Sequence, residues 1–279
     1  MDRTVMRVLD LFSGIGGFSL GLERAKMETV AFCEIDAKAR LVLKKHWPEV
    51  PIYEDVSTLK GSDLHDIDVI CGGSPCQDIS LAGKGAGLEG ERSGLWFQFH
   101  RLIKEIRPRY AIIENVSALR SRGLDQVLRS LFEIGYDAEW HCIPASAVGA
   151  PHRRDRIWIV AYPSSGERET GAEEQGVLRP LPRDGSVNDN LGGRSATHPI
   201  DVSHPVFAGL EGQRNLTSRI SEKLKDPSYS SWWSIEPDVG RVAHGVPKRV
   251  DRLKQLGNAV VPQIPELIGR AIMEHENAA

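Results

Sequence analysis

Residues 7–17 read Arg7-Val-Leu-Asp-Leu-Phe-Ser-Gly-Ile-Gly-Gly17, a strand-like run followed directly by a glycine turn. The run 7–12 is largely apolar and predicts a strand, and the glycines predict a turn that leads into the amphipathic segment 18–24. Glycines at such a turn let the backbone approach a bound nucleotide and present the amides of a helix N-terminus. In dinucleotide-binding folds an acidic residue further along binds the ribose hydroxyls, and Glu34 follows the next strand-like run.

The match to that fingerprint is incomplete, because the third glycine position holds Ser19. Two interpretations therefore remain open for the turn on its own. It forms part of a site for a nucleoside-containing cofactor, or it only shapes the backbone.

The alternation of apolar runs and amphipathic segments continues to residue 162. Six further strand-like runs lie at residues 29–33, 50–53, 67–71, 110–113, 138–143 and 157–161. Apolar residues recur at three- and four-residue spacing over 95–106 and 124–132, and again over 264–272. Strands that alternate with helices predict an α/β fold with a mostly parallel sheet covered on both faces.

The composition is that of a globular protein. The 279 residues are 41% hydrophobic and 26% charged, which excludes collagen-like, coiled-coil and wholly disordered chains. A formal net charge of −3 argues against a uniformly basic nucleic-acid coat protein, but not against a local basic patch. No apolar run predicts a signal peptide or a membrane span, and four cysteines are too few for a disulfide scaffold. We therefore expect a cytoplasmic protein with reduced thiols.

The alternation stops at Pro163. From there to about residue 231 the sequence is rich in Gly, Ser, Pro and Arg, apolar residues are sparse, and no period survives. This region is either a flexible surface insertion or a small irregular lobe whose loops contact a ligand.

One cysteine is distinguished by its position. Cys76 ends the stretch Gly72-Gly-Ser-Pro-Cys76, directly after the strand-like run 67–71. Ligands of open α/β sheets bind at the carboxyl ends of the strands, and Pro75 with the paired glycines predicts a turn that holds the sulfur out of the core. The other cysteines lie inside strand-like runs and are expected to be small buried side chains, namely Cys33, Cys71 and Cys142. Without the other motifs, Cys76 could equally be a small buried side chain.

A carboxylate follows on the next strand. Glu114, in Glu114-Asn-Val116, ends the run that begins at Tyr110, and a neighbouring parallel strand would place it beside Cys76. Burial that raises its pKa would suit it to general acid work. A helix-capping acid is the alternative.

Two polar segments complete the motifs. In Pro151-His-Arg-Arg-Asp-Arg156, an extended backbone would point His152, Arg154 and Arg156 to one side, where they would bind a phosphate or a base edge. A solvated charge run is the alternative. Gln255-Leu-Gly-Asn-Ala-Val-Val-Pro262 predicts a tight turn before the last helix, or an ordinary loop.

Taken in this order, the motifs resemble those of the cytosine-5 DNA methyltransferase family of bacteria and phages. The resemblance covers residues 5–161 and 240–276 and implies a Rossmann-like fold that binds S-adenosylmethionine. It rests on the stretch 10–17, Pro75-Cys-Gln, Glu114-Asn-Val, Arg154-x-Arg156 and Gly257-Asn-Ala-Val. One departure is His152, where the family usually has glutamine.

The resemblance implies methyl transfer from S-adenosylmethionine to carbon 5 of a cytosine that is flipped out of duplex DNA. Cys76 would add to carbon 6 as a thiolate, and Glu114 would contact ring nitrogen 3. Arg154 and Arg156 would raise the thiolate fraction, and Arg156 would also hold the base and the glutamate. The glycine-rich stretch 77–95 resembles the family's mobile loop, which closes over the flipped base.

The resemblance also implies the cofactor contacts, and no metal. Phe12 would stack on adenine, the turn of Gly14, Gly16 and Gly17 would approach the methionine part, and Glu34 would bind the ribose hydroxyls. Asp55 would bind the adenine amine, and Asn258 would approach the cofactor from the far side. The remaining implied cofactor-binding residues are Ile35, Val56 and Pro75.

On this basis residues 1–162 form the catalytic and cofactor-binding domain. Residues 163–240 form the target-recognition region, and residues 241–279 return to the catalytic domain. We expect a monomer that binds double-stranded DNA and no membrane, with a cognate restriction endonuclease as a candidate partner.

Three other functions remain open. One branch of the family methylates cytosine in transfer RNA with the same catalytic set. A nicotinamide-dependent oxidoreductase would explain the glycine turn and Glu34 but not Cys76. A non-catalytic relic would bind DNA without methylating it.

The charge is unevenly distributed. Segments 92–109 and 241–254 each carry five basic side chains and one acidic side chain, and residues 152–156 carry three and one. We expect these segments to form a phosphate-binding face near the cleft.

Overall fold

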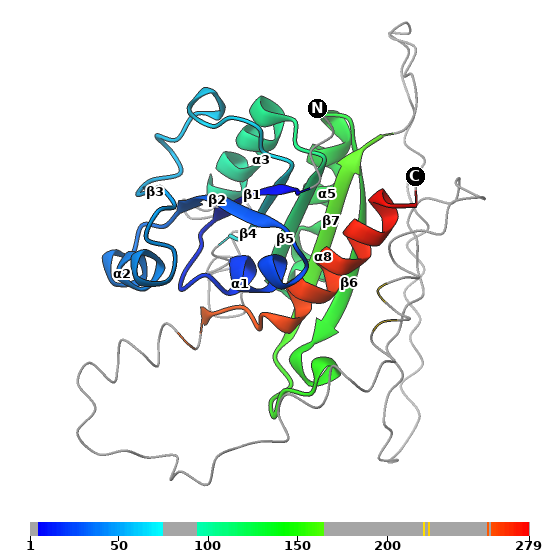
Figure 1. The fold of residues 1–279 in the computed structure, drawn as a ribbon. Helices are drawn as coiled ribbons and strands as arrows, with labels where there is room; N and C mark the ends of the chain where they lie inside the picture. The colour runs from blue at the N-terminus through cyan, green and yellow to red at the C-terminus, as the bar shows by residue number, and fades with distance from the viewer. Residues whose placement is uncertain are drawn as a thin grey trace, which may run out of the picture.

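Seven strands form one sheet in the order β3-β2-β1-β4-β5-β7-β6 (Figure 1). The structure is a computed structural model that describes residues 5–74, 94–164, 220, 223, 256 and 258–278. The strands are β1 (Arg7–Leu11), β2 (Glu28–Cys33), β3 (Ile52–Tyr53), β4 (Val69–Gly73), β5 (Tyr110–Val116), β6 (Tyr136–Pro144) and β7 (Asp155–Pro163). All seven strand-like runs in the sequence are confirmed as strands.

The sheet is mostly parallel, as expected, but one strand runs the other way. Neighbouring strands from β3 to β5 pair in parallel, whereas β7 is antiparallel to both β5 and β6. The connection from β6 to β7 spans residues 145–154 and includes a short 3₁₀ helix, η3 (Ala145–Val148). A parallel crossover needs a dozen or more residues, usually with a helix, so this short connection favours an antiparallel neighbour.

Helices cover both faces of the sheet. They are α1 (Gly17–Arg24), α2 (Ala37–His46), α3 (Gly94–Ile106), α4 (Leu119–Arg122), α5 (Leu124–Glu133) and α8 (Gln263–Glu276). The amphipathic segments at 18–24, 95–106, 124–132 and 264–272 are confirmed as helices. Asp36 caps α2 by accepting a hydrogen bond from the Lys38 amide at 2.8 Å, a typical helix start.

The alternation of side chains along each strand divides the core in two. Leu9 and Leu11 of β1 pack in a cluster with Phe99 of α3 and Leu131 of α5. Val8 points the other way, because successive strand residues face opposite sides of a sheet. It packs in a second cluster, which includes Leu22 of α1 and Leu267 of α8.

Helix α8 lies beside α1, although the two helices come from opposite ends of the sequence (Figure 1). Ile220 is buried in the same cluster, and Lys223 forms an ion pair with Glu274 of α8 at 2.6 Å. Both residues are helical, so the region from 163 to about 231, predicted to lack periodicity, includes a helical contact with the main body. Residues 165–219 and 224–240 lie outside the described residues. No helix in the described part of the chain is long and apolar enough to cross a membrane.

Candidate active site

Four of the predicted site residues, Phe12, Glu34, Asp55 and Glu114, lie where parallel strands end, as does Gly73. Phe12 follows β1, Glu34 follows β2, Asp55 comes shortly after β3, Gly73 ends β4, and Glu114 lies near the end of β5. The carboxyl ends of parallel strands share one edge of the sheet, which is where α/β folds bind ligands.

The glycine turn is tied to the second strand. Gly16 has φ +85°, and a Cβ placed there would lie 2.5 Å from the ring of Trp47, so both the backbone and the space demand glycine. The buried Glu34 carboxylate accepts hydrogen bonds from the Gly14 amide at 2.7 Å and from the Asp36 amide at 2.8 Å. Glu34 therefore holds the turn in place, a structural role that the motif alone does not reveal.

The surroundings of the turn fit an adenosine-containing cofactor. Phe12 is half-buried, and its ring stacks on Phe99 with centroids 6.4 Å apart, while Ile35 is 76% exposed directly after Glu34. A Cβ added at Gly14 would meet no atom within 4 Å, so the turn borders open space. Asp55 accepts hydrogen bonds from the Ser57 hydroxyl at 2.7 Å and amide at 2.8 Å, which lower the pKa of its carboxyl. Aromatic, aliphatic and carboxylate groups of this kind suit a purine and its hydroxyl-bearing sugar.

The final segment of the chain reaches the same turn. A Cβ added at Gly17 would lie 2.7 Å from the backbone oxygen of Val260, so residues around 260 pack directly on the start of α1. Asn258 lies two residues earlier and is exposed.

The paired glycines after Cys71 are strand residues. Gly72 and Gly73 complete β4, so the prediction that they form a turn is wrong. Gly73 pairs with Glu114 of β5, and a Cβ added at Gly73 would lie 2.6 Å from Glu114 Oε2. The absence of a side chain therefore gives the carboxylate its position.

Glu114 pairs with an arginine from the antiparallel strand. Arg156 Nε lies 2.8 Å from Glu114 Oε1. Because β7 runs opposite to β5, its first residues lie at the edge where β5 ends, and Arg156 aligns with Val116. Burial raises the pKa of the Glu114 carboxyl, while the charges of Arg156 and Arg154 oppose that rise. The result is a carboxyl group that is partly desolvated, paired with the Arg156 guanidinium and subject to the charge of Arg154.

The segment before β7 is not extended, so the prediction that three side chains alternate onto one face is wrong. Residues 151 and 152 form a bend, Arg154 has φ +36°, and His152 is exposed. Burial and the neighbouring Arg156 lower the pKa of Arg154, while Glu114 raises it. Arg154 and Arg156 therefore both act electrostatically on Glu114, Arg156 from the start of β7 and Arg154 from the irregular segment before it.

The structure describes three of the four cysteines. Cys33 and Cys71 are buried, as predicted, and burial raises the pKa of Cys33 to about 12 and that of Cys71 well above its usual value. Thiols of this kind are inert. Cys142 is half-buried rather than buried, because β6 is an edge strand. Pro75, Cys76 and the stretch 77–93 lie outside the described residues, as does Gly257.

The two basic residues directly before β5, Arg107 and Arg109, do not lie near the site. Arg107 donates to the Ile134 carbonyl and lies over the Tyr136 ring, and Arg109 pairs with Glu276. Both arginines precede β5 and therefore lie at the amino ends of the parallel strands, so the expectation of a phosphate-binding face is wrong for them. Arg92 and residues 241–254 lie outside the described residues.

A buried aspartate beside the turn, Asp10 of β1, bonds to helix α1, and the motif did not predict this contact. Asp10 has no exposed surface, and its Oδ2 accepts a 2.7 Å hydrogen bond from the Ser19 hydroxyl of α1. Burial raises its pKa to about 7. The sequence signal for this contact was an acidic residue, Asp10, within the otherwise largely apolar run 7–12.

Known proteins are similar in sequence to the part of the chain that contains the candidate site. A model of the C-5 cytosine-specific DNA methylase family matches residues 6–230. The type II methyltransferase M2.BsuMI of Bacillus subtilis (strain 168) is 37% identical over 164 residues, which are 56% of this chain and 42% of that protein. The type II methyltransferase M.CviJI of Paramecium bursaria Chlorella virus IL3A is 38% identical over 165 residues, 58% of this chain and 45% of that protein.

The matched part of the chain thus spans less than half the length of either relative. Among solved structures, the methyltransferase EhMeth of Entamoeba histolytica superposes with a TM-score of 0.50 and 19% identity over 60% of this chain and 56% of that chain, a similarity of fold. Because the family model covers most of the sequence, the chain belongs to the C-5 cytosine-specific DNA methylase family.

Proposed function

We propose that the protein is a DNA cytosine-5 methyltransferase that uses S-adenosylmethionine. The observation that carries the proposal is the Glu114–Arg156 pair, 2.8 Å apart, at the carboxyl end of β5 and against Gly73 of β4. Cys76 follows Gly73 by three residues in the sequence. A carboxyl group at the end of β5 and a cysteine that follows the neighbouring strand β4 in the sequence are the groups that cytosine activation requires.

Each residue has a distinct task in the proposed reaction. The thiolate of Cys76 adds to carbon 6 of a cytosine flipped from the duplex, which makes carbon 5 electron-rich. Glu114 contacts ring nitrogen 3, and its raised pKa favours the protonated form that donates a hydrogen bond there. Arg156 fixes the carboxyl, and Arg154 adds positive charge. Loss of the carbon 5 proton after methylation releases the sulfur and restores the cysteine.

The cofactor would occupy the edge formed by β1, β2 and β3. Phe12, Ile35 and Val56 would hold its adenine, Glu34 its ribose, and the turn at Gly14–Gly17 its methionine part; Asp55, Pro75 and Asn258 complete the proposed contacts. S-adenosylmethionine supplies the methyl group when bound. Glu34 already accepts two backbone hydrogen bonds, but an ionised carboxylate has further lone pairs for hydroxyl groups.

The test is methyl transfer by the wild type and by Cys76→Ser. With labelled S-adenosylmethionine, the wild type should label duplex DNA, and bisulfite sequencing should locate 5-methylcytosine in one sequence context. Cys76→Ser should lower turnover at least a thousandfold, because a hydroxyl is a far weaker nucleophile than a thiolate, and should leave cofactor binding within about threefold. Near-normal turnover by the variant would rule out the covalent step.

The same assay separates the other functions. Label found in transfer RNA and not in DNA would replace the proposal with the RNA-methylating branch of the family. The family match gives no support to a nicotinamide-dependent oxidoreductase. A wild type that binds DNA and labels neither nucleic acid would point to a non-catalytic relic.

A further inference from the structure

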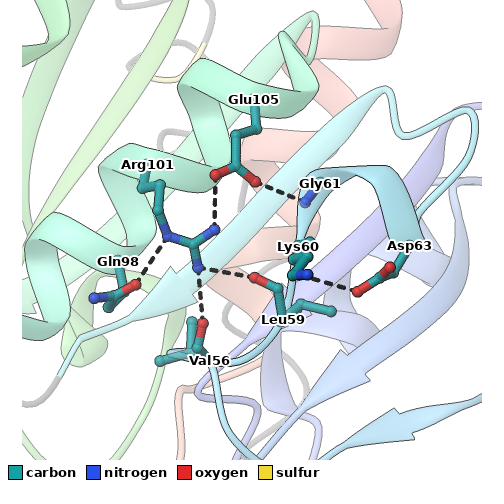
Figure 2. Close-up of polar contacts among 8 residues, drawn as sticks. All are labelled: Val56, Leu59, Lys60, Gly61, Asp63, Gln98, Arg101 and Glu105. Carbon is teal, nitrogen blue, oxygen red and sulfur yellow. Dashed lines mark hydrogen bonds and ion pairs between the residues drawn. The ribbon is translucent and has the colours of Figure 1, made fainter.

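An arginine on α3 bonds to the loop that follows β3. Arg101 donates to the backbone carbonyls of Val56 at 3.0 Å and Leu59 at 2.8 Å (Figure 2). These two carbonyls belong to a turn of the chain that begins at Asp55. A guanidinium has donors in a fixed fork, so it can hold two carbonyls at a set separation, which a lysine cannot do.

The guanidinium is itself held on its other side. Its Nε donates to Gln98 Oε1 at 2.9 Å, and its NH1 donates to Glu105 Oε1 at 2.8 Å. Gln98 and Glu105 lie one helical turn before and after Arg101 on α3, so the helix presents all three side chains together (Figure 2).

Glu105 closes the arrangement by bonding the far end of the loop. Its Oε2 accepts a hydrogen bond from the Gly61 amide at 2.7 Å. A Cβ added at Gly61 would lie 2.7 Å from Cβ of Glu105, so the loop and the helix are in direct contact there. The loop from Val56 to Gly61 is therefore fastened to α3 at three backbone points.

The same helix supports a second part of the proposed cofactor site. Phe99 of α3 stacks on Phe12 with the rings 18° apart. Phe12 and Val56 leave different strands, β1 and β3, which are separated in the sheet by β2. Helix α3 therefore contacts both the segment that follows β1 and the segment that follows β3.

We propose that Arg101 is a positioning residue for the adenine end of the cofactor site, which it acts on through the Val56–Gly61 loop. This inference rests on the proposed function, because it assumes that Asp55 and Val56 bind adenine. Loss of the two carbonyl bonds would free the loop, so that ordering it would oppose cofactor binding. The effect falls on cofactor affinity and not on the chemistry at Glu114, which lies on β5.

The experiment compares four full-length proteins by calorimetric titration with S-adenosylhomocysteine. They are the wild type, Arg101→Gln, Arg101→Lys and the control Arg107→Gln. The control removes an arginine that also bonds a backbone carbonyl, but at the amino ends of the strands. We expect Arg101→Gln to raise Kd at least tenfold, Arg101→Lys to raise it less, and Arg107→Gln to change it less than twofold.

A methylation assay on DNA adds a second readout. Arg101→Gln should raise KM for S-adenosylmethionine by a factor similar to that for Kd, while kcat at saturating cofactor falls less than threefold. If Arg101→Gln fails to fold, Arg101→Lys provides the test, and we expect it to raise the Kd for S-adenosylhomocysteine at least threefold.

The outcomes separate the two levels of the proposal. Folded Arg101 variants that bind S-adenosylhomocysteine as tightly as the wild type would overturn the inference and leave the proposed function standing. A kcat that falls in proportion to affinity would overturn the positioning role. A wild type that binds no S-adenosylhomocysteine would overturn the proposed function, and the inference with it.

Discussion

At the scale of single residues, Gly72 and Gly73 at the end of β4 have different neighbours. A Cβ at Gly72 would lie 2.4 Å from the backbone oxygen of Leu11, which the sheet holds in place. A Cβ at Gly73 would lie 2.6 Å from the tip of the Glu114 side chain, which can rotate away. A side chain at Gly72 would therefore disturb the packing of the sheet. A side chain at Gly73 would instead displace Glu114, a proposed catalytic group.

We therefore expect Gly73→Ala and Gly72→Ala to fail in different ways. Gly73→Ala should keep its free energy of unfolding within about 1 kcal/mol but lose at least a hundredfold in kcat, because Glu114 is displaced from Arg156. Gly72→Ala should lose about 1–3 kcal/mol of stability, as overpacking does. Urea denaturation and methylation kinetics on both variants test this, and a Gly73→Ala enzyme with normal kcat would contradict it.

Asp10 is a buried residue whose titration affects stability. Its Oδ1 has no hydrogen-bond partner among the described residues, and burial raises its pKa from 3.8 to about 7. Between these two values the folded protein keeps a proton that the unfolded chain has released. The contribution of Asp10 to stability is therefore full below pH 4 and is lost as the pH rises to 7.

Asp10→Asn should remove this dependence, since the amide does not titrate. Unfolding free energies at several pH values between 4 and 8 should show the wild type losing up to about 1.4 kcal/mol per pH unit relative to the variant, with the loss ending near pH 7. A constant difference between the two proteins across that range would mean that Asp10 has an ordinary pKa.

At the scale of elements, α8 completes one face of the sheet. Leu267 has no exposed surface and packs in the cluster that holds Val8 and Leu22. The Tyr110 hydroxyl donates to Glu276 at 2.7 Å, which fastens the end of α8 to the start of β5. The helix therefore contributes to the stability of strands that lie far from it in the sequence.

Leu267→Ala should lower the free energy of unfolding by about 2–5 kcal/mol, because it leaves a cavity in the core. Leu41→Ala is the matched control, since Leu41 on α2 is 68% exposed, and it should change stability by less than about 0.5 kcal/mol. Thermal and urea denaturation of both variants measure the difference. Equal stability for the two would show that α8 does not contribute to the cooperative core.

At the scale of the whole molecule, the parallel strands bring distant segments to one edge. Phe12, Glu34, Asp55, Gly73 and Glu114 lie at the ends of β1 to β5, and the sequence predicted this position for Glu34 and Glu114. The basic segment before β5 shows the limit of such reasoning, because Arg107 and Arg109 lie at the opposite edge. Both arginines come directly before β5, which places them at its amino end, whereas Glu114 lies near its carboxyl end.

Hydrophobic periodicity and glycine turns are local signals, so the sequence alone predicted all seven strands, four of the helices and the mostly parallel sheet. The resemblance of its motifs indicated the family. The tertiary structure decided what depends on contacts between segments. The antiparallel direction of β7 brings Arg156 to Glu114, the bend at Arg154 replaces an extended run, and Gly73 leaves room for a carboxylate from the next strand. Arg101 likewise acquires its proposed role only through two backbone carbonyls more than forty residues earlier. Local patterns specify which element forms, whereas packing specifies which atoms meet.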